Sequence, residues 1–212
     1  MSEASLGIEE RSMRIIESEI GTHDYTAPQW SIVRRVIHAT ADFDFAKPYR
    51  NGIIFSANAI ESAFEALKKR RYIVVDVDMV QSGINKKSAA KIGTSVICNI
   101  SNKDVLNISK NENKTRSKVA MRYSSKEVDG GIVVIGNAPT ALYELVNMIK
   151  EGVARPLLVV GIPVGFVSAE ESKLELSKTN IEFITNIGRK GGSPAASSII
   201  NALMLMYINN LD

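Results

Sequence analysis

Only two histidines, His23 and His38, occur in the 212-residue sequence, and histidine is the side chain best suited to exchange a proton near neutral pH. His23 lies in a short polar stretch, where a surface position is expected. His38 lies near the end of an expected helix, whose dipole favours a charged imidazolium, and Asp42 and Asp44 follow it closely. A lone helical histidine is more often structural than catalytic, so the residues alone leave both interpretations of His38 open.

Carboxylates and the single cysteine could bind a metal or act as nucleophiles, but their positions in the sequence do not favour either role. Asp76 and Asp78 end an expected strand, but no histidine or second acidic cluster accompanies them, so no metal site is predicted. Cys98 closes another strand and is interpreted as a small core residue. The sequence shows no pairing of a nucleophile with a base and no aromatic platform for nucleic acid.

Glycine-rich segments at 136–141, 161–167 and 188–193 each follow an expected strand. Glycine lets the backbone approach a ligand closely, and a helix that begins after it presents free N–H groups to an anion. The same residues occur in ordinary turns, so it is the occurrence of three such loops at one sheet edge that favours a site. No G-x-G-x-x-G follows a strand, and GRKGGS lacks the spacing of a phosphate loop, which disfavours a dinucleotide enzyme but leaves an unconventional nucleotide site open.

After residue 71, the sequence predicts alternating strands and helices, which must position the groups described above. Strands are predicted at 72–77, 94–98, 132–135, 157–160 and 181–185, mostly as the continuous Val/Ile runs of strands buried on both faces. Helices are predicted at 115–123, 140–151, 169–178 and 194–208. This alternation predicts a three-layer α/β/α sandwich with a five-stranded, mainly parallel, flavodoxin-like sheet. Ligands of such sheets bind beyond the carboxyl ends of the strands.

The first 70 residues have a helical pattern. A helix is predicted before Gly21, a second from Pro28 in its first turn, and a third at 56–69 with Ser56 as its cap. We therefore expect a single domain over residues 1–212, with a helical N-terminal segment at 1–70 and a βα-alternating core at 71–212.

Composition and charge narrow the class of protein. With 45% hydrophobic and 23% charged residues, the chain is typical of soluble globular proteins. It has no long apolar run and no secretory leader, and its one cysteine cannot form an internal disulfide, so a cytoplasmic protein away from membranes is expected. The net charge of +3 lies within residues 101–130, which form either a solvated helix face or an anion-attracting surface. A nucleic-acid surface would need more charge over a wider face.

Four segments resemble the precorrin-8X methylmutase family, which includes the cobalt-precorrin-8 enzymes. They are IHATADFDF (37–45), GNAPTAL (136–142), PVGFVSAEESK (163–173) and RKGGS (189–193). The segments occur in the order and spacing of the family, and the resemblance extends from about Ile8 to Leu203, nearly the whole chain.

The resemblance implies an isomerase of corrin-ring biosynthesis. In the family, a methyl group moves from carbon-11 to carbon-12 of (cobalt-)precorrin-8 by an acid-assisted 1,5-sigmatropic shift. His38 matches the position of the proton donor, and Ser12, Arg34, Thr115 and Arg116 match substrate contacts. The resemblance further implies that no cofactor is needed, that any cobalt belongs to the substrate, and that the protein is a homodimer with its site near the subunit boundary.

Such a substrate has clear physical requirements. A flat tetrapyrrole rimmed with acetate and propionate groups needs an apolar slot, arginine and backbone N–H groups at its edge, and one proton donor. Asn137 and Gly165, in two of the strand-end loops, are expected to add contacts to the substrate or corrinoid product. Two alternatives from other classes are a corrinoid-binding carrier without catalysis and a flavodoxin-like domain that binds a nucleotide or flavin.

Overall fold

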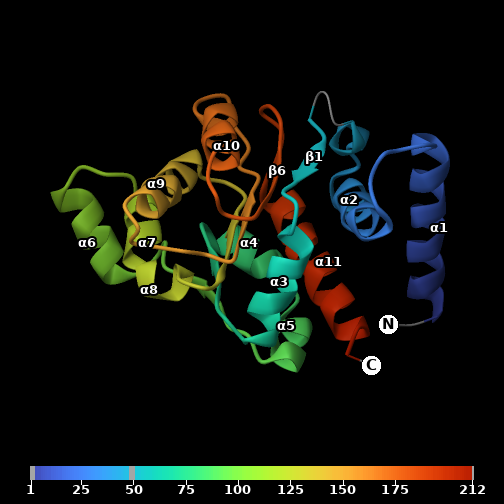
Figure 1. Cartoon of the computed structure of the whole chain (residues 1–212), viewed down its shortest axis with the longest axis horizontal. Helices are drawn as coiled ribbons and strands as arrows, with labels where there is room; N and C mark the ends of the chain where they lie inside the picture. Colours follow the sequence, from blue (N-terminus) through green and yellow to red (C-terminus); the bar gives the residue numbers. More distant parts are fainter. Residues whose placement is uncertain (1–2, 48–50, 212) are drawn as a thin grey trace.

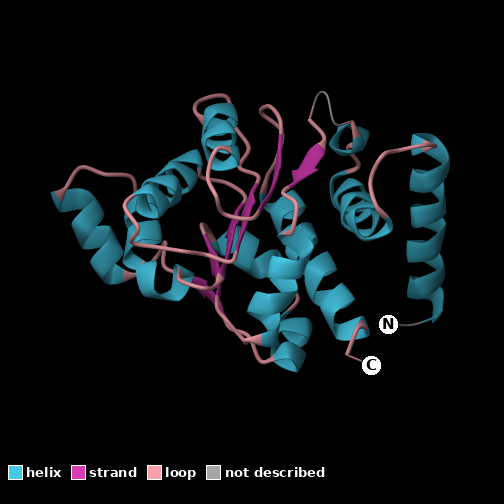
Figure 2. Ribbon diagram, in the orientation of Figure 1, coloured by secondary structure: helices cyan, strands magenta, loops and turns pink. Residues whose placement is uncertain are grey.

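The computed structural model describes residues 3–47 and 51–211 (Figures 1 and 2). The helices are α1 (Glu3–Ile20), α2 (Ala27–Thr40), the 3-10 helix η1 (Phe43–Ala46), α3 (Ala59–Lys68), α4 (Asp78–Gly83), α5 (Lys86–Ile92), α6 (Lys103–Asn111), α7 (Arg116–Tyr123), α8 (Ser125–Val128), α9 (Pro139–Lys150), α10 (Ala169–Ser177) and α11 (Ser193–Asn209). The strands are β1 (Ile53–Phe55), β2 (Ile73–Val75), β3 (Val96–Cys98), β4 (Ile132–Ile135), β5 (Leu158–Gly161) and β6 (Phe183–Asn186).

These strands form one sheet in the order β1-β6-β5-β4-β2-β3. The five strands from β2 to β6 are parallel, as predicted, and β1 runs antiparallel to β6 at one edge. Numbered among themselves, the parallel strands run 2-1-3-4-5, which is the order of doubly wound sheets of the flavodoxin type. Strand order therefore reverses between β2 and β4, and a crevice is expected beyond their carboxyl ends.

Helices cover both faces of the sheet, which explains the continuous apolar runs of its strands. In β4, Ile132 and Val134 join the core formed with α2, α3, α5 and α11. The intervening Val133 and Ile135 join the core formed with α9 and α10 on the other face. Figure 2 shows the sheet between these two helical layers, so the predicted three-layer architecture is confirmed.

The prediction of five strands was one too few. Strand β1 has only three residues, and its partner β6 lies about 130 residues further along the chain, so no local pattern announced it. The predicted cap at Ser56 was also wrong. The Ser56 hydroxyl instead donates to Glu182 at 2.5 Å and accepts the Phe183 N–H at 2.7 Å, which ties the end of β1 to β6.

Helix α2 begins where the sequence predicts it, with Pro28 in its first turn and a capping box between Thr26 and Gln29. Its apolar face packs chiefly against α11, and α1 packs against α2 at the outer edge of the molecule (Figure 1). Within the described ranges, no helix is both long and apolar enough to span a membrane.

Candidate functional site

A buried carboxylate holds the chain beyond the carboxyl ends of β2 and β4, at the switch in strand order. Asp76, directly after β2, accepts three hydrogen bonds from the backbone N–H groups of Gly136, Asn137 and Ala138, at 3.1, 2.8 and 2.7 Å. Burial raises the pKa of Asp76 above its usual value, and the three N–H groups act in the opposite direction by stabilising the charged form. Asp76 therefore holds the loop between β4 and α9, where the segment 136–142 begins.

Glycines in two of these loops are required by packing within the protein. A Cβ atom at Gly136 would lie 2.9 Å from the Cβ of Ala196 in α11. A Cβ at Gly191, whose φ is +157°, would lie 2.2 Å from the carbonyl oxygen of Ile162. Because neither position has room for a side chain, these glycines bring the loops and α11 into close contact with one another.

The loops after β5 and β6 are joined into one rim. The Gly165 N–H donates to the carbonyl oxygen of Arg189 at 3.1 Å, and the Gly192 N–H donates to that of Ile162 at 3.0 Å. The Arg189 guanidinium lies 5.7 Å from the centre of the Phe166 ring. Phe166 and Val167 are 85% and 81% exposed, so this rim presents apolar surface beside a cation.

His38 lies exposed in the last turn of α2, and the chain after it returns to the same rim. Asp42 and Asp44 each accept a hydrogen bond from the Lys190 ammonium, at 2.7 and 2.8 Å. Hydrogen bonds from Lys190 and Lys47 hold the pKa of Asp44 at about 2. The segments 37–45 and 189–193 are therefore in direct contact.

A hollow of about 350 Å³ adjoins Ala39, between the end of α2, α4 and the start of α11.

Ser12 and Arg34 lie on the neighbouring helices α1 and α2. The Ser12 hydroxyl donates to the carbonyl oxygen of Ile8 in its own helix, at 2.9 Å. Arg34 forms an ion pair with Glu17 at 2.6 Å, and its buried Nε has no acceptor in the part of the chain that the structure describes. A cavity of about 490 Å³ between the two helices is lined by Arg34 and by charged side chains of α1. Arg34 thus retains one unused donor for an anion.

Thr115 and Arg116 lie in the other helical layer. The Thr115 side chain caps α7, and its hydroxyl donates to that of Thr140, near the start of α9, at 3.2 Å. Arg116 is exposed and has no partner among residues 3–47 and 51–211. The structure therefore places Asn137 and Gly165 at the carboxyl edge of the sheet and connects the segment after His38 to the same edge through Lys190. Thr115 contacts α9 through Thr140, and the exposed Arg116 follows Thr115 in the chain.

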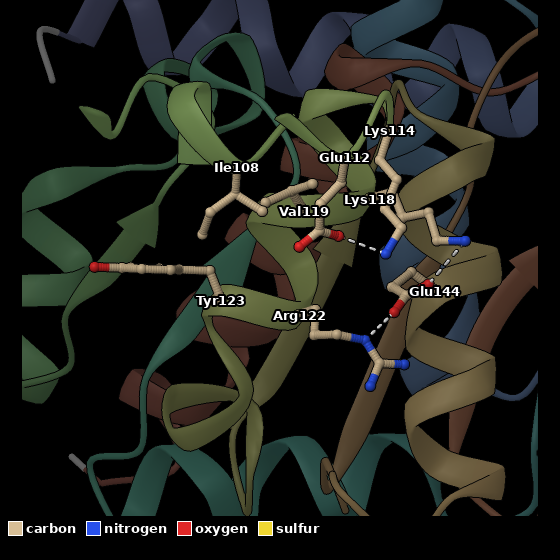
Figure 3. A pocket seen from close by; sticks show the side chains of 8 residues that line it. All are labelled: Ile108, Glu112, Lys114, Lys118, Val119, Arg122, Tyr123 and Glu144. Atoms are coloured by element: carbon tan, nitrogen blue, oxygen red, sulfur yellow. Dashed lines mark hydrogen bonds and ion pairs between the residues drawn. The ribbon is translucent and has the colours of Figure 1, made fainter. Parts of the chain in front are cut away.

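A separate cavity of about 240 Å³ lies between α6, α7 and α9 (Figure 3). Its buried carboxylate, Glu144, forms ion pairs with Lys118 at 3.4 Å and with Arg122. Arg122 also pairs with Glu151 at 2.8 Å. Part of the positive charge in the 101–130 segment is therefore neutralised within the protein, and charges of both signs line this cavity.

The other histidine and the single cysteine have environments that favour packing over catalysis. His23, expected at the surface, is half-buried and also stacks on Trp30, with 4.1 Å between ring centres. Burial raises the pKa of the Cys98 thiol to about 12, which makes it a poor nucleophile. Across the described residues, no group of three or more His, Cys, Asp or Glu side chains could hold a metal ion.

Comparison with known proteins now identifies the family. A sequence model of precorrin-8X methylmutase matches residues 7–206. The chain belongs to the precorrin-8X methylmutase family. It is 47% identical over 199 residues to the cobalt-precorrin-8 methylmutase of Priestia megaterium, covering 94% of this chain and 87% of that protein. It is 43% identical over 207 residues to the cobalt-precorrin-8 methylmutase of Leptospira interrogans, covering 94% and 92%.

A solved methylmutase structure has the same fold. The crystal structure of a precorrin-8x methyl mutase from Thermus thermophilus matches this chain with a TM-score of 0.87 at 36% identity, covering 96% of this chain and 98% of that one. The resemblance inferred from the four methylmutase segments is confirmed, and so is the predicted fold class.

Sequence reasoning missed the side chains that connect the methylmutase segments. Asp76 was considered only as a metal ligand, which was not predicted, and Lys173 and Lys190 were given no role. The signal available for the two lysines was their position inside the segments 163–173 and 189–193. Their contacts cross long stretches of chain and could not be inferred from spacing.

Proposed function

We propose that this protein is an isomerase of corrin-ring biosynthesis that moves a methyl group from carbon-11 to carbon-12 of a precorrin-8 substrate. The observation that carries the proposal is family membership over nearly the whole chain, together with an exposed His38 whose segment, 37–45, contacts the rim formed by the loops after β5 and β6. The two relatives described above are both named cobalt-precorrin-8 methylmutases, which supports a cobalt-containing substrate.

In the proposed reaction His38 is the general acid. Its imidazolium donates a proton to the macrocycle, which makes the conjugated ring electron-poor and favours migration of the methyl group. The bond from the methyl group to carbon-11 breaks as the bond to carbon-12 forms, so no carbon is exchanged with a donor. Loss of one proton from the rearranged ring balances the proton gained. The enzyme then contributes orientation and one protonation, with no nucleophile.

Recognition of the substrate carboxylates falls to groups that have unused donors. Arg34, with its free Nε, and the unpaired Arg116 suit carboxylate groups at the edge of the ring. Ser12 and Thr115 are proposed to assist them, and Asn137 and Gly165 to contact the substrate from the loops. The exposed Phe166 and Val167 suit an apolar wall for a flat ring.

We further propose that the protein is a homodimer with the site near the subunit boundary. Pockets that enclose ligands span roughly 300–1,000 Å³. The hollow that adjoins Ala39, at about 350 Å³, is at the small end for a tetrapyrrole with carboxylate arms. A second copy would supply a further wall and cover the exposed side chains of Val164, Phe166 and Val167.

The same proposal includes the absence of a cofactor and a cytoplasmic location. An intramolecular methyl shift needs no electron carrier, and the cobalt is proposed to arrive within the substrate. The single cysteine suits a reducing compartment. Activity of protein dialysed against a chelator, and recovery of the protein in the cytosolic fraction of its cells, would test these two statements.

The central test follows the visible spectrum of the substrate, because rearrangement alters its conjugated system. We expect wild-type protein to convert cobalt-precorrin-8 or precorrin-8, and His38→Ala to bind the corrinoid product while its rate of conversion falls at least 100-fold. Full turnover by His38→Ala would refute the assignment of the proton donor.

A matched control is available because the chain has one other histidine. His23→Phe keeps an aromatic ring against Trp30, so we expect near-normal turnover from it. Binding of product without turnover of either substrate by wild-type protein would indicate a corrinoid carrier. Binding of a flavin without affinity for corrinoids would contradict the proposed function altogether.

A further inference from the structure

The turn that follows His38 is held by a lysine from the far end of the chain. The Lys190 ammonium donates to both carboxylate oxygens of Asp42, at 2.9 and 2.7 Å, and to Asp44 at 2.8 Å. Asp42 in turn accepts the Asp44 N–H at 3.0 Å and so caps η1. One cation therefore fixes two carboxylates on the short segment that leads away from the proposed proton donor.

Lys190 is itself held through its backbone. Its carbonyl oxygen accepts hydrogen bonds from the Lys173 ammonium at 2.6 Å and from the Asn186 side-chain amide at 2.9 Å. Lys173, from α10, also donates to the carbonyl oxygen of Gly188 at 2.8 Å and is only 2% exposed. Because both acceptors of the buried Lys173 side chain lie in one loop, its two hydrogen bonds fix the conformation of that loop.

Few other charged groups can fix the end of α2. Helix α11, its main packing partner, contains no Asp, Glu, Lys or Arg. The glutamates of α1 that pair with α2 bind Arg34 and Arg35, which precede His38. After His38 the chain passes through Ala41, with φ at +52°, before it reaches the two aspartates. Among the described residues, Lys190 is therefore the ion-pair partner of these two aspartates that comes from a distant part of the chain, whereas Lys47 is a local one.

We propose that Lys190 is a positioning residue for His38, and that Lys173 acts through it by holding the loop 188–190. The inference rests on the proposed role of His38 as proton donor. Lys190 sets the direction in which the imidazole faces the substrate, by anchoring the turn 41–44, and does not itself contact the reacting atoms.

The kinetic test uses Lys190→Met, which keeps length and removes charge. We expect its kcat to fall about 10- to 100-fold with KM and the product Kd within about threefold, because misplacing a proton donor affects the chemical step more than binding. Lys190→Arg should recover most of the rate. The matched control is Lys47→Met, which removes another ion pair of Asp44, at 2.9 Å, without touching the loop, and should leave kcat unchanged.

A second variant protects the test against misfolding. Asp42→Asn keeps the side-chain oxygen that caps η1 and weakens only the bond to Lys190, so it should lower kcat several-fold with an unchanged melting temperature. An unchanged kcat in both Lys190→Met and Asp42→Asn would overturn the inference, and so would an equal loss in Lys47→Met.

A readout without substrate separates this inference from the proposed function. The chain has two histidines, so proton NMR resolves the two ring Cε1–H signals, and His23→Phe assigns them. We expect Lys190→Met to move the His38 signal and leave the His23 signal in place, whereas Lys47→Met moves neither. A displaced His38 signal in protein that converts no precorrin would refute the methylmutase function alone. An undisplaced His38 signal would refute the positioning role alone.

Discussion

Lys173 places an amine in the protein interior, where no carboxylate of residues 3–47 and 51–211 forms an ion pair with it and only the charge of Glu170 acts on it. Burial lowers the pKa of Lys173 to about 7, against the ordinary 10.5, because the charged form loses its hydration there. Two backbone carbonyls accept its hydrogen bonds, and a neutral amine has two N–H groups to donate, so its geometry suits the uncharged form as well.

This environment predicts a pH dependence of stability. Between pH 7 and 10.5 the unfolded chain binds a proton at Lys173 that the folded chain does not, so folding becomes more favourable as pH rises through this window. Measured against Lys173→Met, the free energy of unfolding of wild type should gain on the order of 1.4 kcal/mol for each pH unit crossed. Denaturant unfolding at pH 7, 8 and 9 checks this, and a difference that stays flat with pH would contradict it.

At the scale of the elements, the loops at the carboxyl edge depend on backbone contacts that tolerate no side chain. Gly191 has a positive φ and lies against the carbonyl oxygen of Ile162, so the loop after β6 is pressed onto the loop after β5. Any side chain at this position must push the two loops apart, and Lys190 moves with them.

Gly191→Ala is therefore expected to lower the free energy of unfolding by about 3 kcal/mol and to reduce turnover. Gly152→Ala is the matched control, since Gly152 also has a positive φ but has nothing within 4 Å of a Cβ atom. It should cost only about 1 kcal/mol and leave turnover unchanged. Equal losses of stability in the two variants would show that backbone strain alone, and not the contact with Ile162, sets the cost.

The elements also show which parts of the fold could be predicted from sequence. The five parallel strands were predictable because burial on both faces requires continuous Val/Ile runs, as in β4. Strand β1 was missed because it is short and finds its partner β6 only in the folded chain. The short helices α4 and α5 were missed for the related reason that six or seven residues carry too little periodicity.

The site was predictable in part, for similar physical reasons. His38 and the loop glycines belong to local segments, so their positions could be inferred from the family resemblance. The contact of Lys190 with Asp42 spans 148 residues, and the bonds of Asp76 to the β4–α9 loop span about 60. Such contacts depend on strand order and helix placement, which no local pattern contains.

At the scale of the whole molecule, the proposed dimer can be tested by the mass of the protein in solution. The protein should sediment with twice the 23.2 kDa mass of one chain. Phe166→Asp should raise the dimer dissociation constant about tenfold or more, because it puts a charge where an exposed aromatic side chain is covered. Val153→Asp changes another exposed apolar residue, 48% exposed, which precedes β5 and thus lies at the opposite sheet edge; it should leave the mass unchanged. A monomeric wild type would refute the dimer.

The pairing of first elements with last ones has a consequence for how the chain is made. Strand β1 pairs with β6, and the apolar face of α2 is covered by α11, the final helix. During synthesis, which adds about 5–20 residues per second, the N-terminal helices must wait for nearly the complete chain before they can dock. The histidine end of α2 is thus among the last regions to assemble, and a prematurely terminated chain would lack the proposed proton-donor site even though most of the sheet had been translated.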